Sequence, residues 1–373
     1  MKKLFTFLGV MLIMAGSALC AQEVYSSAPL QTSVSHEDTS LEDGEDWIPS
    51  ISLDSRFSYN RVIPGSKAGF GGDGLYLNID GKISKNFSYS LCQKFFSAQG
   101  EDDSTFDNTD WLTLSYDLGN FTFTAGKDVL LLGSYEYDAY DIDSYFDMNS
   151  LFYNSFSAYQ WGVKALWSNK EESSSVAIQV TTSPFSYSPR EDNIYSYNIG
   201  WYSALDWYES IWSVNFMEYE PGKYVKVLAL GNMFHMGDFS LGLDCISRGV
   251  KFAADDEVTI TLMPSYEFDK VRLFGKVGWE YRSTDVPYDF WGEYYSNEDM
   301  IIANEECDTT LPAFLITGKD YLFYGLGVEY YPVDSVRLHA VWGSNNYTKR
   351  HTLNVGLTWR FDVVNAISRI SNR

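Results

Sequence analysis

Residues 126–162 read GKDVLLLGSYEYDAYDIDSYFDMNSLFYNSFSAYQWG. This segment is dense in Tyr and Asp and shows no regular alternation of polar and apolar residues. The segments on either side do alternate: NFTFTAGK at 120–127 and YQWGVKALW at 159–167. Alternation with a period of two is the pattern of a β-strand that has one polar and one apolar face. The segment is therefore a long insert between two strands, and its place depends on what the other strands build.

The same alternation continues along the chain from residue 48, and a clear example is TLNVGLTWRF at 352–361. We count about sixteen such segments, each close to the ~9–11 residues that a tilted membrane strand needs. They are predicted to begin near Ile48, Gly74, Phe87, Asp110, Phe121, Ser157, Ser174, Tyr195, Ser210, Lys223, Phe239, Val258, Val271, Tyr321, Val336 and Thr352.

The connections between these segments alternate in length. Every second one is tight, as at 84–86, 118–120, 207–208, 236–238, 268–270 and 332–334. The intervening ones are longer and rich in Gly, Pro and acidic residues, as at 64–73, 99–108, 131–156, 184–193 and 283–320. Short turns on one rim and long loops on the other are typical of outer-membrane barrels. The sequence thus predicts an all-β, transmembrane, antiparallel up-and-down β-barrel over residues 48–362, with both termini on the periplasmic side.

A soluble β-sandwich or propeller is the alternative, because it also has alternating strands. Two observations favour the membrane barrel. The apolar faces carry aromatic residues near strand ends, as interfacial girdles require: Tyr59, Trp167, Trp212, Tyr281, Trp359 and Phe361. The opposite faces carry full charges in the middle of strands, which a sandwich core does not tolerate unpaired.

The N-terminal residues indicate export. Lys2 and Lys3 precede an apolar stretch at 4–18, and small residues follow at 18–21, so we expect residues 1–21 to be a signal peptide. A lipid-anchored Cys20 is the alternative, but Leu19 directly before it is a poor fit to a lipoprotein site. We expect a flexible periplasmic lead-in at 22–47 and a short tail at 363–373. The expected location is the outer membrane of a Gram-negative bacterium.

The composition excludes some functions. The 373 residues have a formal net charge of -23, which makes nucleic acid an improbable partner. Cys92, Cys245 and Cys307 form an odd set without metal-like spacing, so we predict neither a disulfide framework nor a metal site. Four histidines are present. His36 lies in the lead-in, His235 lies at a short-turn end on the wrong rim for a hydrolase site, and His339 lies mid-strand. His351 begins the last strand from the loop side, and no Ser or Asp spacing around it indicates a hydrolase. We therefore expect no enzyme activity and no cofactor.

Several segments resemble outer-membrane porins related to the phosphate-selective porins O and P. The similar segments are 125–146, 159–163, 325–345 and 352–361, and a diffuse likeness in strand cadence covers most of 48–361. The resemblance implies a sixteen-stranded and usually trimeric barrel whose third long loop folds into the lumen. The insert after Gly126 is the third long connection of this chain.

If the insert folds inward, its carboxylates line the narrowest part of the pore. The predicted constriction residues are Tyr135, Glu136, Asp138, Asp141, Asp143 and Asp147. A cluster of carboxylates favours cations over anions. The alternative is a solvated surface loop, as acidic runs usually are.

The polar faces of the strands predict a lumen wall that is basic. Its cationic residues are Arg56, Lys82, Lys94, Lys164, Lys226, Arg248, Arg272, Lys276, Arg282, Arg337 and Arg360. The acidic residues expected on the same faces are fewer: Asp54, Asp80, Asp244, Glu280 and Glu329. An acidic loop that faces a basic wall sets a transverse field across the pore. The acidic insert also speaks against phosphate selectivity, which would need the basic residues to dominate the constriction.

We therefore predict a passive diffusion channel for small hydrophilic solutes or ions, surrounded by outer-membrane lipid. A homotrimer is implied by the resemblance alone. One alternative is a surface-binding barrel for glycans or adhesion that does not conduct, since the loop at 283–320 is rich in acidic and aromatic residues. A second alternative is a phosphate-selective or other anion-selective porin.

Overall fold

Sixteen strands and one short helix form the described part of the computed structural model, which covers residues 48–65, 68–95, 108–139, 143–146, 149–150, 158–186, 192–250, 257–282, 320–346 and 350–364. The predicted signal peptide, the lead-in, the tail beyond residue 364 and the loop at 283–319 lie outside these residues. The strands are β1 (Ser50–Ile63), β2 (Ala68–Lys82), β3 (Phe87–Lys94), β4 (Thr109–Leu118), β5 (Phe121–Val129), β6 (Tyr159–Ser168), β7 (Ser174–Thr182), β8 (Tyr195–Leu205), β9 (Tyr208–Glu220), β10 (Lys223–Met236), β11 (Phe239–Gly249), β12 (Glu257–Phe268), β13 (Val271–Arg282), β14 (Asp320–Val333), β15 (Val336–Asn345) and β16 (His351–Asp362). The helix is α2 (Tyr135–Asp138).

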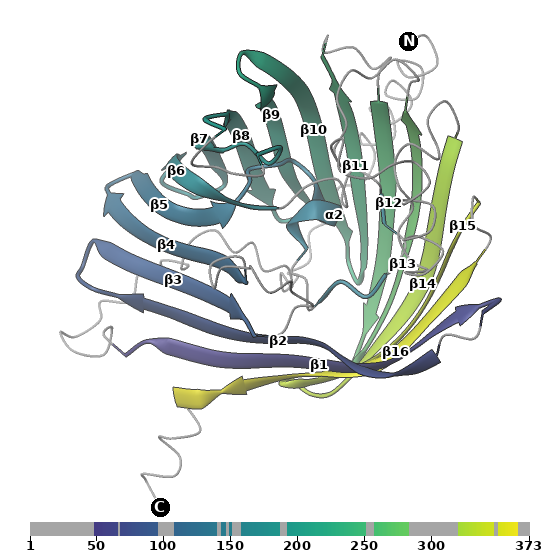
Figure 1. Ribbon diagram of the computed structural model, residues 1–373. Helices are drawn as coiled ribbons and strands as arrows, with labels where there is room; N and C mark the ends of the chain where they lie inside the picture. The colour runs from purple at the N-terminus through teal and green to yellow at the C-terminus, as the bar shows by residue number, and fades with distance from the viewer. Residues whose placement is uncertain are drawn as a thin grey trace, which may run out of the picture.

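The strands close into a single barrel (Figure 1). Each strand pairs with its neighbours in sequence, and β1 pairs antiparallel with β16 through contacts such as Arg56 opposite Thr358. The predicted all-β, sixteen-stranded antiparallel barrel is confirmed. The predicted strand starts lie within two residues of the observed ones except for β2, which begins at Ala68 rather than near Gly74.

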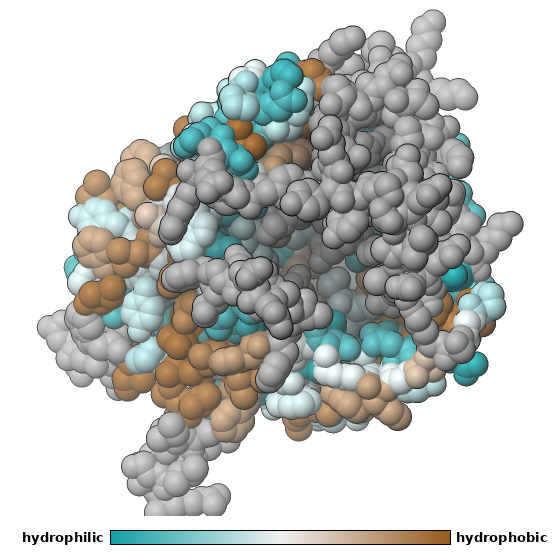
Figure 2. Space-filling model, viewed as in Figure 1, coloured by the Kyte–Doolittle hydropathy of each residue, from teal (hydrophilic) through white to brown (hydrophobic). Residues whose placement is uncertain are grey.

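The outer side of the wall is apolar and the inner side is largely polar. On β7, Val176 and Ile178 are 39% and 56% exposed on the outside, while Gln179 on the inside is 1% exposed. Figure 2 shows hydrophobic side chains gathered on the outside of the wall at the lower left of the view. So large an apolar exterior needs a partner or an apolar medium. Within the described ranges, no helix is long and apolar enough to cross a membrane.

The two rims differ in their connections. On one, called here the short-turn rim, two-residue turns join β4 to β5 and β10 to β11, and Gly119 and Gly237 adopt φ values of 61° and 65° there. A positive φ of this size favours glycine, which has no Cβ to clash. The other rim carries the longer connections and is called the long-loop rim. One connection on it is tight: only residues 221–222 join β9 to β10.

The insert between β5 and β6 leaves the wall at the end of β5 and enters the interior. Figure 1 shows α2 inside the ring of strands. The described parts of this insert, residues 130–139, 143–146, 149–150 and 158, are called the lumen loop below. The prediction that the third long loop folds inward is confirmed by the contacts described next.

Candidate functional site

The first part of the lumen loop is hydrogen-bonded to polar side chains on the inner wall. The amide of Leu131 donates to Gln179 Oε1 at 2.8 Å, and its carbonyl accepts from Asn215 Nδ2 at 2.6 Å. The amide of Gly133 donates to Ser213 Oγ at 2.9 Å. Strands β7 and β9 therefore supply side-chain partners for a loop backbone that has left its own sheet.

Gly133 allows this close approach. A Cβ at this position would lie 2.5 Å from the carbonyl oxygen of Ala229 and 2.6 Å from that of Ile211. Both obstacles are backbone atoms of the wall, so they cannot turn aside as a side chain would. A glycine is required for the loop to rest directly on β9 and β10.

The helix α2 is fastened by one buried carboxylate, Asp244 on β11. Its oxygens accept hydrogen bonds from Ser134 Oγ at 2.8 Å, the Tyr135 amide at 3.0 Å and the Glu136 amide at 2.8 Å. Ser134 is also the N-cap residue and accepts from the Tyr137 amide. Free amides at a helix start are natural partners for an anion, so Asp244 extends the cap from the barrel wall.

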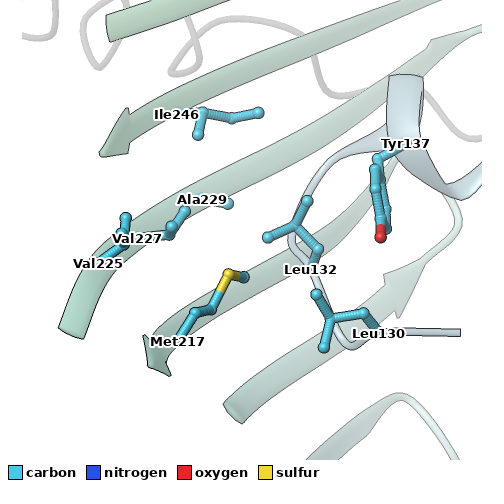
Figure 3. Close-up of a cluster of buried hydrophobic side chains, with 8 residues drawn as sticks. All are labelled: Leu130, Leu132, Tyr137, Met217, Val225, Val227, Ala229 and Ile246. Atoms are coloured by element: carbon cyan, nitrogen blue, oxygen red, sulfur yellow. The ribbon is translucent and has the colours of Figure 1, made fainter. Parts of the chain in front are cut away.

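Apolar side chains complete this contact (Figure 3). They come from both the lumen loop and the inner faces of β9, β10 and β11, and all are at most 6% exposed. The set is Leu130, Leu132, Tyr137, Met217, Val225, Val227, Ala229 and Ile246. The loop is thus held on this wall by hydrophobic burial as well as by hydrogen bonds.

Glu136 makes the next connection, to β13. Its carboxylate lies 3.1 Å from Lys276 Nζ and accepts from the Ser150 amide at 3.1 Å. Lys276 also donates to Asn149 Oδ1 at 2.5 Å. The Glu136 and Lys276 side chains are only 2% and 8% exposed. The pair fastens two distant points of the loop and presents little charge to the lumen.

The far part of the loop reaches the opposite strands β15, β16 and β1. Asp143 pairs with Arg337 and, at 3.0 Å, with Arg360 Nη2. Arg56 Nη1 donates to the carbonyl oxygen of Ser144 at 2.8 Å. Because its first part rests on β7 to β11, the loop spans the interior of the barrel.

Tyr145 adds a further contact between the far part of the loop and the same strands. Its ring stacks on the imidazole of His339 with centroids 4.1 Å apart. The guanidinium groups of Arg56 and Arg337 lie 5.5 and 5.4 Å from the ring centroid, within cation–π range. Burial and the nearby Glu329 carboxylate raise the pKa of Tyr145 above its usual range. The phenol therefore stays neutral.

Asp138 differs from the other described loop carboxylates because it is exposed to the lumen. Although the side chain is accessible from the lumen, the protein packed around its carboxyl displaces part of its hydration and raises the pKa of Asp138 to about 6, and the ammonium group of Lys164 opposes this rise. Tyr135, on the same helix, is half-buried. Burial, followed by the carboxylates of Glu209 and Asp244, raises its pKa. The predicted constriction residues Asp141 and Asp147 lie outside the described residues.

Most of the predicted basic residues lie on the inner face, and many are paired. Lys164 Nζ is 2.6 Å from Asp128, Arg248 pairs with Glu257, and Arg272 Nη1 is 3.3 Å from Glu329. Lys94 lies opposite Tyr76, with its Nζ 5.4 Å from the ring centroid. Lys82 has the same parity on β2 as Tyr76 and therefore also faces inward. For Arg282 only the backbone position, at the end of β13, is described.

The structure corrects the prediction that Lys226 lies on the lumen wall. Its neighbour Val227 lies opposite Asn215, whose side chain binds the lumen loop, so the odd-numbered residues of this part of β10 face inward. Lys226 therefore faces outward, opposite Phe216. The prediction is wrong because it assumed a polar inner face. Here the inner face is apolar, since Val225 and Val227 pack against the loop.

The prediction also missed the neutral side chains that hold the loop. Gln179, Asn198, Ser213 and Asn215 are at most 3% exposed. Asn198 links them, because its Oδ1 accepts from Asn215 and its Nδ2 donates to Gln179. The signal was present as uncharged polar residues at inward positions of adjacent predicted strands. A search restricted to charges could not detect it.

The barrel is similar to solved porin structures. A triple mutant of Rhodopseudomonas blastica porin superposes with a TM-score of 0.55 at 12% identity, over 84% of this chain and 100% of that one. A loop-deletion mutant of OmpT, an outer membrane protein of Vibrio cholerae, gives 0.54 at 13% identity, over 84% of this chain and 99% of that one. No protein-family model and no curated protein matches the sequence. At these identities the likeness concerns the fold.

Proposed function

We propose that this protein is an outer-membrane porin, a passive channel for small hydrophilic solutes or ions. One observation carries the proposal: a loop crosses the interior of a closed barrel and is fastened on both sides of it. Such a loop narrows a passage without adding a chemical step. The apolar exterior suits lipid, and the porin-like fold agrees with this interpretation. Export by the predicted signal peptide and assembly as a homotrimer belong to the same proposal.

We infer a weak preference for cations, because two of the described loop carboxylates are paired with cations and one is not. Glu136 and Asp143 are matched by Lys276, Arg337 and Arg360, so their charges largely cancel at the wall. Asp138 is the described loop carboxylate that is exposed to the lumen. A carboxylate beside a narrow passage lowers the free energy of a cation there and raises that of an anion. Among the described loop carboxylates, we therefore assign to Asp138 the largest effect on selectivity.

The test is single-channel conductance of the refolded mature chain in a planar bilayer, with the reversal potential measured in a salt gradient. We expect steady ohmic steps, a reversal potential that indicates cation preference, and a shift toward anions in Asp138→Asn. Asp238→Asn is the matched control, since Asp238 is exposed in a turn of the short-turn rim. Combined neutralisation of Glu136, Asp138, Asp141 and Asp143 should shift the potential further toward anions.

Two results would favour the alternatives. A correctly folded barrel that does not conduct would refute the porin proposal and favour a surface-binding protein. A wild-type reversal potential that indicates anion preference would favour an anion-selective porin. In that case the arginines around Asp143, rather than Asp138, would control the passage.

A further inference from the structure

A second cluster of polar side chains lies on the short-turn side of the α2 attachment, where β9, β10 and β11 meet the short-turn rim. His235 Nε2 is 3.1 Å from Glu209 Oε1, and His235 Nδ1 is 3.0 Å from Ser240 Oγ. The three residues come from three adjacent strands, with His235 on the middle one. The wall therefore presents an imidazole between a carboxylate and a hydroxyl.

All three side chains face the lumen. Glu209 has the same parity on β9 as Ser213, which binds the loop, and His235 has the same parity on β10 as Val227. Ser240 lies directly opposite His235. The His235 and Glu209 side chains are 17% and 10% exposed. They are sheltered but not fully enclosed.

The cluster has an unused acceptor. Glu209 is 7% exposed, and its second oxygen, Oε2, has no hydrogen-bond partner. A buried carboxylate oxygen without a partner is costly, and such atoms usually mark a missing donor, water or ion. The hydroxyl of Tyr135, whose pKa is raised by burial and next by the Glu209 charge, also has no partner. The Tyr135 hydroxyl can donate, whereas the second Glu209 oxygen is an acceptor that a cation can also occupy.

We propose that His235 and Glu209 bind a divalent transition-metal ion of the Zn²⁺ class. Ligand bonds of about 2.0–2.2 Å in a tetrahedral site place neighbouring donor atoms about 3.3–3.6 Å apart, so the observed separation of 3.1 Å has to open by only a few tenths of an ångström to admit the ion. With the metal on Nε2, the Nδ1–H donates to Ser240 Oγ. Ser240 then orients the ring, as partners of metal-binding histidines commonly do. Water completes the coordination.

The donor set selects the class of ion. An imidazole nitrogen suits Zn²⁺, Cu²⁺ or Ni²⁺, whereas Mg²⁺ and Ca²⁺ prefer oxygen donors only. Within the part of the chain that the structure describes, no group of three or more His, Cys, Asp or Glu side chains is arranged to hold a metal ion. The site therefore has two protein ligands and an auxiliary hydroxyl, and we expect micromolar rather than nanomolar affinity.

The experiment is a calorimetric titration of the refolded chain in detergent with Zn²⁺. We expect one micromolar site that is weakened at least tenfold in both His235→Gln and Glu209→Gln, and that Mg²⁺ does not occupy. His351→Gln is the matched control, since His351 stacks on Trp342 at the long-loop end of β16, and it should leave the affinity unchanged. The titration measures binding without conduction, so it stands or falls independently of the proposed channel.

Unchanged Zn²⁺ affinity in folded His235→Gln would overturn the proposal, because the ion would then bind elsewhere, for example at cysteine or at His36. If His235→Gln does not fold, Glu209→Gln tests the site by the same criterion. In Ser240→Ala we expect a loss of only a few-fold, since Ser240 orients a ligand and is not one itself. Equal affinity for Mg²⁺ in the wild type would also contradict a site built on imidazole.

Discussion

Replacing Asp244 with alanine tests how the lumen loop is held. The carboxylate accepts three hydrogen bonds from the start of α2, at 2.8, 3.0 and 2.8 Å. Hydrogen bonds to a charged group contribute about 1.5–3 kcal/mol each. Removing Asp244 also relieves the cost of burying its charge, and lumen water can hydrate the freed amides. We therefore expect a net local loss of about 2–4 kcal/mol.

The assay is hydrogen exchange at the amides of Tyr135 and Glu136, which open with the local unfolding free energy. A loss of about 2–4 kcal/mol corresponds to exchange that is about 30- to 700-fold faster. Global unfolding of the barrel should change little, because the strand ladders remain intact. Single-channel recordings should show more current noise as the loop leaves the wall.

Asp80→Ala is the control for loss of a lumen charge. Asp80 faces the interior from β2 and bonds to Ser90 Oγ at 2.5 Å rather than to the loop. It should leave the exchange of the α2 amides unchanged. If Asp244→Ala folds and those amides exchange at the wild-type rate, the carboxylate does not hold the loop, and the reasoning is refuted.

Two further predictions concern the charges of the loop. The cation preference should fall as the pH is lowered from 7 to 5, because the carboxyl of Asp138, whose pKa is raised to about 6, becomes neutral below that value. Reversal potentials at both pH values check this, and Asp138→Asn should remove most of the change. Lys276→Met should destabilise the loop by about 3–5 kcal/mol, since it leaves Glu136 buried without a cation. Adding Glu136→Gln should restore most of that loss, measured by hydrogen exchange at the α2 and Ser150 amides, and no recovery would show that the two residues are not coupled.

The strands were predictable because their signal is local. A period of two follows from the pleat of each strand, so TLNVGLTWRF indicates which of its residues share a face whatever surrounds it. The alternation of tight and long connections then gave the two rims. The start of β2 was missed by six residues, from 68 to 74, because its first residues, AGFGG, are too rich in glycine to show alternation.

The facing of Lys226 shows the limit of local patterns. Alternation assigns residues to two faces, but which face is inner was inferred from polarity. On β10 the inner face is apolar, because the lumen loop covers it. Where a strand packs against the loop, its inward residues are apolar and a polar residue can face outward, which is the reverse of the usual pattern. Only the position of the loop reveals such a strand.

The sequence by itself determined the number of strands, the two faces of most of them, and a Tyr- and Asp-rich insert at the third long connection. Only the tertiary structure decided which charges meet. Asp143 and Arg360 are 217 residues apart, and Asp244 and Glu136 are 108 apart. Such pairs form because β1 meets β16 and the loop crosses the space that this closure encloses. Strand patterns arise from residues that are neighbours in the chain. Pairing across the lumen depends instead on how the barrel closes and on the depth at which each residue lies in it, and a local sequence pattern contains neither.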